Sequence, residues 1–182
     1  MKTACVLLAD GFEEVEALTP IDYLRRSGVE VTAIGVTGPS PRGGHGVEVR
    51  ADRGPEALAA DYDCVVVPGG GKGAENLAAS AAVSSCVKRH FAAGKLVAAI
   101  CAAPAIVLHG SCGILAGKRF TCFPGLESKV SGAIFVEDRV VADGALITAR
   151  AAGCAGEFAY AIVNALVGEE AADLLAEKVL LG

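Results

Sequence analysis

Cys101 is the residue of this sequence best placed for covalent chemistry. It stands inside the apolar stretch LVAAICAAPAIVL at residues 96–108. The first half of that stretch is typical of a buried parallel strand, and the second half, with Pro104 near its start, is typical of a helix. A sulfur at this joint faces the free N–H groups of the first helical turn, which favour a thiolate. A buried structural cysteine is the alternative.

A thiolate nucleophile needs a proton partner, and a carboxyl group is the best candidate. Among the histidines, His90 and His109 fall at predicted helix ends and are expected on the surface. His45 lies in a Gly-rich loop from which it can reach a pocket. Glu16 stands near the start of the first predicted helix, and its carboxyl, buried beside a thiolate, would stay protonated and hydrogen-bond the sulfur.

The glycine-rich segment at residues 69–73 directly follows a predicted strand. It lacks the spacing of a phosphate-binding loop and of a dinucleotide fingerprint, so it predicts no nucleotide cofactor. Backbone N–H groups in such a turn can instead stabilise a developing oxyanion. We expect Gly70 and Ala102 to supply these donors, with Gly69 beside them in the pocket; a plain tight turn is the alternative.

Strands and helices alternate along the chain. Strands are predicted at residues 3–9, 29–36, 47–50, 63–67, 118–122, 136–140 and 145–149, and helices at 13–27, 156–167 and 169–179. Pro20 is expected to kink or restart the first helix. The alternation predicts a mostly parallel sheet between helical layers. The loops at 10–16, 68–73 and 101–104 follow strand ends, so we expect them to converge on one small pocket.

Composition narrows the class of protein. The 182 residues fit one domain, and 53% of them are hydrophobic. The net charge is −5 and no Lys/Arg cluster is present, which argues against nucleic acid or anionic membrane as partners. The apolar runs are too short for a signal peptide or a membrane span, so we expect a cytoplasmic protein. Seven cysteines without C-x-x-C spacing indicate free thiols, and no metal-ligand spacing is present.

The sequence also contains GFEEVEA at 11–17, DCVVVPGG at 63–70, GAENL at 73–77 and AAICAAP at 98–104. In order and spacing these motifs resemble the DJ/ThiJ/PfpI superfamily, and within it the subfamily of the parkinsonism-associated protein deglycase and its bacterial relatives. The similarity runs over nearly the whole chain, residues 1–182 as a single domain. It implies a flavodoxin-like three-layer α/β sandwich, a mostly parallel sheet with helices on both faces, that is usually a homodimer.

The resemblance assigns roles to residues. Cys101 matches the family's reactive cysteine, which peroxide oxidises to a sulfinate, and Glu16 matches the protonated glutamate that hydrogen-bonds its sulfur. The backbone amides facing the site match Gly70 and Ala102. Arg150 matches the arginine near the family's anion pocket.

Three positions depart from the family pattern. A second family arginine aligns only loosely with His45. The protease-like branch has a histidine directly after the cysteine, and Ala102 in its place argues against peptidase activity. A T-H-P motif of some deglycase relatives corresponds here to TCFP at residues 121–124, so that pocket histidine is missing and Phe123 stands in its place. Cys122 is a candidate neighbour of Cys101 across the pocket.

The resemblance implies an enzyme of glyoxalase or deglycase type without a cofactor or metal. Its substrates would be reactive dicarbonyls such as methylglyoxal, or their early adducts with proteins or nucleotides, in defence against carbonyl and oxidative stress. The alternative is a non-catalytic redox sensor or stress chaperone switched by oxidation of Cys101. Thiamine-precursor biosynthesis, a label the family has carried, has no support in these residues.

Overall fold

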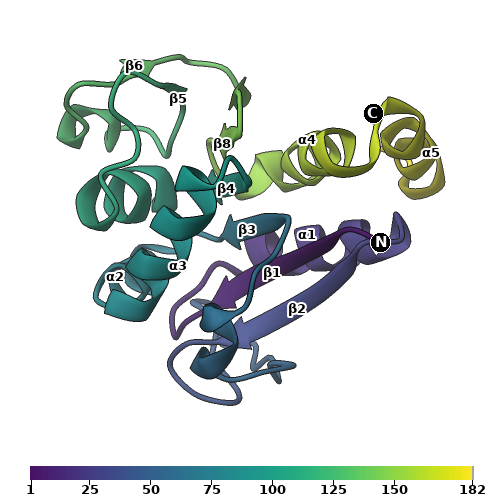
Figure 1. The fold of residues 1–182 in the computed structure, drawn as a ribbon, viewed down its shortest axis with the longest axis horizontal. Helices are drawn as coiled ribbons and strands as arrows, with labels where there is room; N and C mark the ends of the chain where they lie inside the picture. The colour runs from purple at the N-terminus through teal and green to yellow at the C-terminus, as the bar shows by residue number, and fades with distance from the viewer. Residues whose placement is uncertain (182) are drawn as a thin grey trace.

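A six-stranded sheet forms the centre of the computed structural model, which describes residues 1–181 (Figure 1). The strands, in the order β2-β1-β3-β4-β8-β7 across the sheet, are β2 (Glu30–Gly35), β1 (Thr3–Leu8), β3 (Cys64–Val67), β4 (Leu96–Ile100), β8 (Leu146–Ala149) and β7 (Val140–Asp143). All pairings are parallel except that of β7 with β8. The predicted mostly parallel sheet is therefore confirmed, with an antiparallel edge strand. The order reverses direction between β1 and β3, where such sheets bind ligands.

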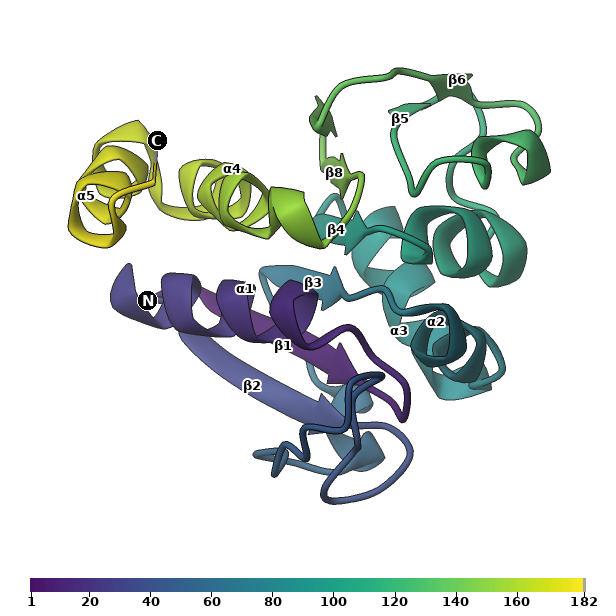
Figure 2. The same cartoon turned by 180° about the vertical axis from the view of Figure 1, so that it is seen from behind.

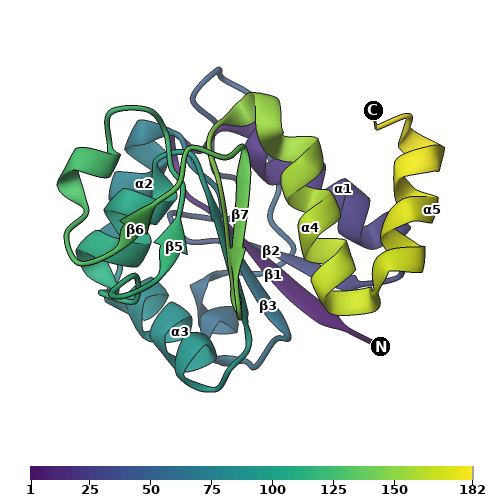
Figure 3. The same ribbon diagram turned by 90° about the horizontal axis from the view of Figure 1, so that it is seen from above.

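Helices cover both faces of the sheet (Figure 3). One face carries α1 (Glu14–Arg26), α4 (Ala155–Val167) and α5 (Glu169–Val179), and the other carries α2 (Gly71–Ala78), α3 (Ala81–Ala92) and a π-helix at Pro104–Ser111. Figure 2 shows α1 and α4 side by side over the sheet. None of the helices in residues 1–181 is long and apolar enough to cross a membrane.

Two apolar clusters lie between these layers, and neighbouring residues of one strand supply both. Val65 packs in the cluster under α2 and α3, whereas Val66 packs in the cluster under α1 and α4. Successive side chains of a strand point to opposite faces, so a strand buried on both faces must be apolar throughout. This explains the continuous run CVVV of β3.

Several predicted elements differ from the structure. α1 continues through Pro20 as one helix instead of restarting, because Pro20 lies on its buried face with Ile21 and Leu24. The strand predicted at 47–50 is reduced to an isolated antiparallel bridge between Arg42 and Glu48, and the N–H of Val47 donates to the Glu14 carboxylate. The strand predicted at 136–140 lies instead at Val140–Asp143, and it forms the expected hairpin around the tight turn at Gly144.

The region between β4 and β7 is the least regular. The strand predicted at 118–122 is reduced to β5 (Arg119–Phe120), which pairs in parallel with β6 (Ile134–Phe135) in a separate two-stranded sheet. Short 3₁₀ turns lie at Glu127–Lys129 in this region and elsewhere at Pro55–Ala59 and Ala152–Cys154. The π-helix at Pro104–Ser111 confirms a helix after Cys101, although with a wider turn than the α-helix.

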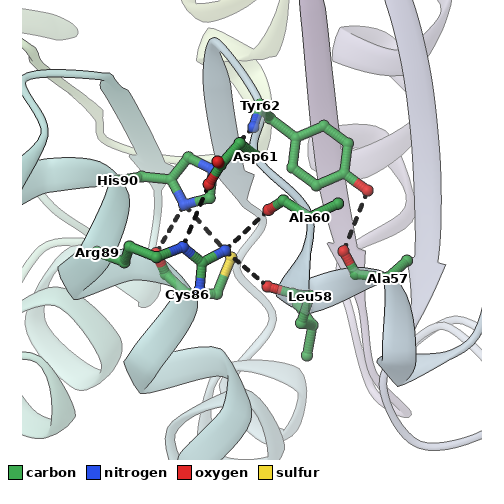
Figure 4. Close-up of polar contacts among 8 residues, drawn as sticks. All are labelled: Ala57, Leu58, Ala60, Asp61, Tyr62, Cys86, Arg89 and His90. Carbon is green, nitrogen blue, oxygen red and sulfur yellow. Dashed lines mark hydrogen bonds and ion pairs between the residues drawn. The ribbon is translucent and has the colours of Figure 1, made fainter.

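His90 is buried, so the prediction that it lies on the surface is wrong; Figure 4 shows its polar contacts. The backbone N–H of Tyr62 donates to His90 Nε2 at 3.0 Å, and His90 Nδ1 lies 2.8 Å from the carbonyl oxygen of Cys86. Because Nε2 accepts a hydrogen bond, the proton of the neutral ring is on Nδ1. Arg89 also binds the carbonyl oxygens of Leu58 and Ala60, so α3 and the segment before β3 are tied together.

Replacing His90 with leucine should destabilise the fold by about 1–3 kcal/mol, because the buried N–H of Tyr62 would lose its acceptor. Urea unfolding measures this change. The matched control is His109→Leu, at a half-exposed position, for which we expect a change within about 0.5 kcal/mol. Equal effects of the two substitutions would show that His90 does not satisfy this amide.

Candidate active site

Three loops meet at the carboxyl ends of β1, β3 and β4, as the sequence predicted. The backbone N–H of Glu13, which leads into α1, donates to the carbonyl oxygen of Gly69 at 3.1 Å. The N–H of Gly69 in turn donates to Glu16 Oε2 at 3.0 Å. A Cβ atom on Gly69 would lie 2.6 Å from the Cβ of Cys101, so all three loops are in contact at this point.

Cys101 has a strained backbone, with φ of +65° in the left-handed region that few residues other than glycine adopt. Its N–H donates to the carbonyl oxygen of Ala149 at 2.9 Å, at the end of β8. All seven cysteines are free thiols, and Cys101 alone is half-buried while the other six are buried. Strain and access at one cysteine are features of a nucleophile held on a sharp strand-to-helix turn.

The Cys101 sulfur is surrounded by hydrogen-bonding groups of the three loops. The backbone amides of Gly70 and Ala102 act on this thiol to lower its pKa, whereas the side chain of Glu16 acts to raise it. These amides favour a thiolate, but burial and the negative charge of Glu16 act more strongly and raise the pKa of Cys101 to about 12. The helix-terminus argument, which predicted a lowered thiol pKa, was therefore wrong for the net shift, because it left out burial and the carboxylate.

Glu16 is 1% exposed, and burial raises the pKa of its carboxyl from 4.5 to about 7. Oε2 accepts a hydrogen bond from the Gly69 amide, whereas the buried Oε1 has no hydrogen-bond partner within residues 1–181. The repulsion that Glu16 exerts on a Cys101 thiolate exists only while Glu16 is ionised. The thiolate is therefore favoured when the shared proton is on Glu16, and a protonated carboxyl can donate to the sulfur.

Glycine is required at the two positions between these groups. A Cβ on Gly69 would lie 2.5 Å from Glu16 Oε2, and one on Gly70, whose φ is +84°, would lie 2.3 Å from the carbonyl oxygen of Gly11. Both distances are too short for real atoms. The missing side chain of Gly69 thus lets the carboxyl and Cys101 approach each other, and that of Gly70 lets the loop after β1 pack against the loop after β3.

Arg150 and His45, the two outer residues predicted for the pocket, have other partners. Arg150 Nη1 lies 3.1 Å from Glu137 Oε1. His45 is exposed, and its Nδ1 lies 3.0 Å from Glu14 Oε2 and 3.5 Å from Glu13 Oε2. Neither side chain hydrogen-bonds Cys101 among the described residues, so their role in a pocket stays a prediction.

Phe123 contributes to the site through its backbone, which the sequence did not reveal. Its N–H donates to the carbonyl oxygen of Cys101 at 2.8 Å, and the residue is 46% exposed. Cys122 is buried, with its thiol 3.6 Å from the carbonyl oxygen of Phe123. The alignment with the T-H-P motif was the one signal that placed this segment beside the cysteine.

The fold and the site define a flavodoxin-like α/β protein with a strained cysteine beside a buried carboxyl. Residues 2–165 match the DJ-1/PfpI family, and the chain belongs to it. It is 39% identical to the Parkinson disease protein 7 homolog of Danio rerio over 94% of this chain and 93% of that protein. It is also 34% identical to a deglycase of Pyrococcus abyssi, over 81% of this chain and 89% of that protein.

Solved structures agree with this assignment. A cysteine-to-alanine mutant of a DJ-1 superfamily protein from Salmonella typhimurium matches with a TM-score of 0.95 and 38% identity, covering 100% of both chains. Oxidised DJ-1 of Toxoplasma gondii matches with a TM-score of 0.96 and 36% identity, over 99% of this chain and 98% of that chain. The predicted fold class and the recognised family are confirmed.

The raised pKa of Glu16 predicts a specific pH dependence of stability. A carboxyl that binds its proton more tightly in the folded state stabilises the fold fully below its unfolded pKa of 4.5, and this contribution is lost as pH rises through about 7. The shift corresponds to about 3 kcal/mol. Between pH 4.5 and 8 the wild type should therefore lose about 3 kcal/mol more than Glu16→Gln, measured by urea unfolding. Glu75→Gln, at an exposed position, should follow the wild type; equal pH curves for all three would contradict the shift.

Gly69→Ala should destabilise the fold by about 1–3 kcal/mol, because the new methyl group would overlap Glu16 and Cys101. The matched control is Gly71→Ala, two residues further on, where a Cβ meets nothing within 4 Å. Because alanine suits a helix better than glycine, the control should be neutral or stabilising. Thermal unfolding of the two variants measures both effects. An unchanged melting temperature for Gly69→Ala would mean that the site is less tightly packed than these distances indicate.

Proposed function

We propose that this protein is a cysteine-dependent, cofactor-independent enzyme of glyoxalase or deglycase type. Its substrates would be reactive dicarbonyls such as methylglyoxal, or their early adducts. The observation that carries the proposal is the convergence on the Cys101 sulfur of two backbone amides and a buried carboxyl whose pKa is raised to about 7. A family relative in Pyrococcus abyssi is named a deglycase, which supports the same chemistry.

In the proposed reaction the Cys101 sulfur attacks the aldehyde carbon of methylglyoxal and forms a C–S bond. The carbonyl electron pair moves onto oxygen, where the amides of Gly70 and Ala102 stabilise it until it takes the proton of the Cys101–Glu16 pair. The product of this step is a hemithioacetal. Each amide is expected to contribute about 10²-fold to the rate.

Glu16 then carries one proton between neighbouring carbons of the substrate. It removes the hydrogen from the carbon bonded to sulfur, and the electron pair moves onto the neighbouring carbonyl oxygen, which takes the hydroxyl proton of the first carbon. Glu16 then returns its proton to the second carbon, and the C=O bond re-forms on the carbon bonded to sulfur, giving a lactoyl thioester. Water hydrolyses the thioester to lactate and restores the thiol. The sum is methylglyoxal plus water giving lactate, so no external oxidant, reductant or cofactor is needed.

The remaining expectations of location and assembly belong to the same proposal. A homodimer is supported by three exposed apolar side chains near the site: Val15 at 49%, Leu18 at 37% and Val47 at 49% exposed. Val15 and Leu18 lie on α1, and the backbone of Val47 contacts Glu14 on the same helix. A cytoplasmic location suits a chain with seven free thiols.

The test follows methylglyoxal loss and lactate formation by the purified protein. Cys101→Ser should abolish turnover, and Glu16→Gln should lower it by at least about 10²-fold, because Glu16 is the proton carrier of the proposed reaction. Cys154→Ala, a buried thiol at the start of α4, is the matched control and should keep turnover. Full activity of Cys101→Ser would overturn the proposal.

A wild type without turnover would favour the second candidate, a redox sensor. The half-exposed position of Cys101 and the proton-donating capacity of Glu16 suit a stabilised sulfinate equally well, and a DJ-1 structure from Toxoplasma gondii is described as oxidised. In the same preparation, peroxide treatment followed by mass spectrometry would then find oxidation concentrated at Cys101 among the seven thiols.

A further inference from the structure

Glu13, Glu14 and His45 form a cluster beside the cysteine site that the proposed reaction does not use. The two glutamates stand at the start of α1, and His45 comes from the long loop after β2. His45 Nδ1 lies 3.0 Å from Glu14 Oε2 and 3.5 Å from Glu13 Oε2. One ligand atom from each of the three residues lies within 4.8 Å of the other two.

These distances suit a small metal ion. A tetrahedral Zn²⁺ ion with bonds of about 2.0–2.1 Å holds its ligand atoms about 3.3 Å apart, a value between the two distances from His45 Nδ1. Two carboxylates and a neutral imidazole also bring two negative charges, which a divalent cation would neutralise. A fourth position would stay open to water.

The other contacts of the ligands leave these atoms available. Glu14 is 7% exposed, and its Oε1 accepts the backbone N–H groups of His45 at 2.8 Å and Val47 at 3.3 Å. This holds its second oxygen, Oε2, toward the imidazole. The carboxylate of Glu13 has His45 as its one ion-pair partner within residues 1–181. Two carboxylate oxygens therefore converge on one ring nitrogen, although their charges repel each other.

We propose that Glu13, Glu14 and His45 bind a first-row divalent cation with an affinity for mixed imidazole and carboxylate ligands, such as Zn²⁺ or Cu²⁺. Such a ligand set suits these ions better than Mg²⁺ or Ca²⁺, which prefer oxygen ligands alone. The backbone of Glu13 contacts Gly69, so the cation would lie next to the cysteine site. The inference does not depend on the proposed reaction.

The competing explanation is an ion pair without a metal. Carboxylates are stabilised at a helix N-terminus, and a protonated His45 would neutralise part of their charge. In the proposal, His45 binds a metal ion together with Glu13 and Glu14, and one ion is bound per chain. In the competing explanation, His45 binds a proton and no stoichiometric ion is bound.

Calorimetric titration with Zn²⁺ distinguishes the two explanations. The titration uses the Cys101→Ser variant as the parent, so that the reactive thiolate does not bind the metal. The parent should bind one ion per chain, and His45→Ala and Glu13→Gln should each weaken binding by at least about tenfold. Both side chains are outside the core, so these variants should fold; Glu14 is left intact because it holds the loop. Copper EPR should show coupling to one imidazole nitrogen, lost in His45→Ala.

The matched controls are His109→Ala and Glu75→Gln, which remove a histidine and a carboxylate that are not in the cluster. They should bind Zn²⁺ with the affinity of the parent. The proposal is overturned if the parent binds no stoichiometric ion, or if His45→Ala and Glu13→Gln bind as tightly as the controls.

Discussion

The hydrogen bond from the Gly69 amide to the buried Glu16 carboxyl is the contact on which the whole site depends. It joins the helix that follows β1 to the loop that follows β3, and it holds the carboxyl against Cys101. A single backbone N–H does not compensate for the desolvation of a carboxylate, and so the pKa of Glu16 rises to about 7. The position that brings the carboxyl to the sulfur is also the position that lets it keep a proton near neutral pH.

The parallel sheet makes this position available. Because β1, β3 and β4 are neighbours and run in the same direction, the segments that follow them emerge at one edge. Glu16, Gly69 and Cys101 are separated by more than thirty residues along the chain, yet Gly69 and Cys101 lie just beyond the ends of β3 and β4, and Glu16 lies in the first turn of the helix that follows β1. The chain need only place a carboxyl, a glycine and a cysteine after three apolar strands, and the sheet brings them together.

The same reasoning shows how much the sequence could predict. Strand ends, helix-breaking glycines and the period of apolar residues are visible in short stretches of sequence. They therefore predicted the sheet, the convergence of the loops and the bounds of α5 (Glu169–Val179). His90 was misplaced because its acceptor role depends on the amide of Tyr62, 28 residues away and outside its own helix. The thiol pKa of Cys101 was misjudged because desolvation is a property of the folded chain, whereas a helix N-terminus is visible in the sequence.

The residue that follows Cys101 restricts what chemistry the site can perform, because Ala102 stands where the protease-like branch of the family has a histidine. Amide hydrolysis needs a proton donor for a poor leaving group, and no histidine adjoins Cys101 to provide it. Addition of a thiol to an aldehyde followed by proton transfer between adjacent carbons needs only one group that can both accept and donate. A carboxyl with a pKa of about 7 is such a group at neutral pH, whereas a carboxyl with the ordinary value of 4.5 would be almost entirely ionised and would repel the thiolate. The proposed dicarbonyl chemistry therefore depends on the burial of Glu16, and not on the cysteine alone.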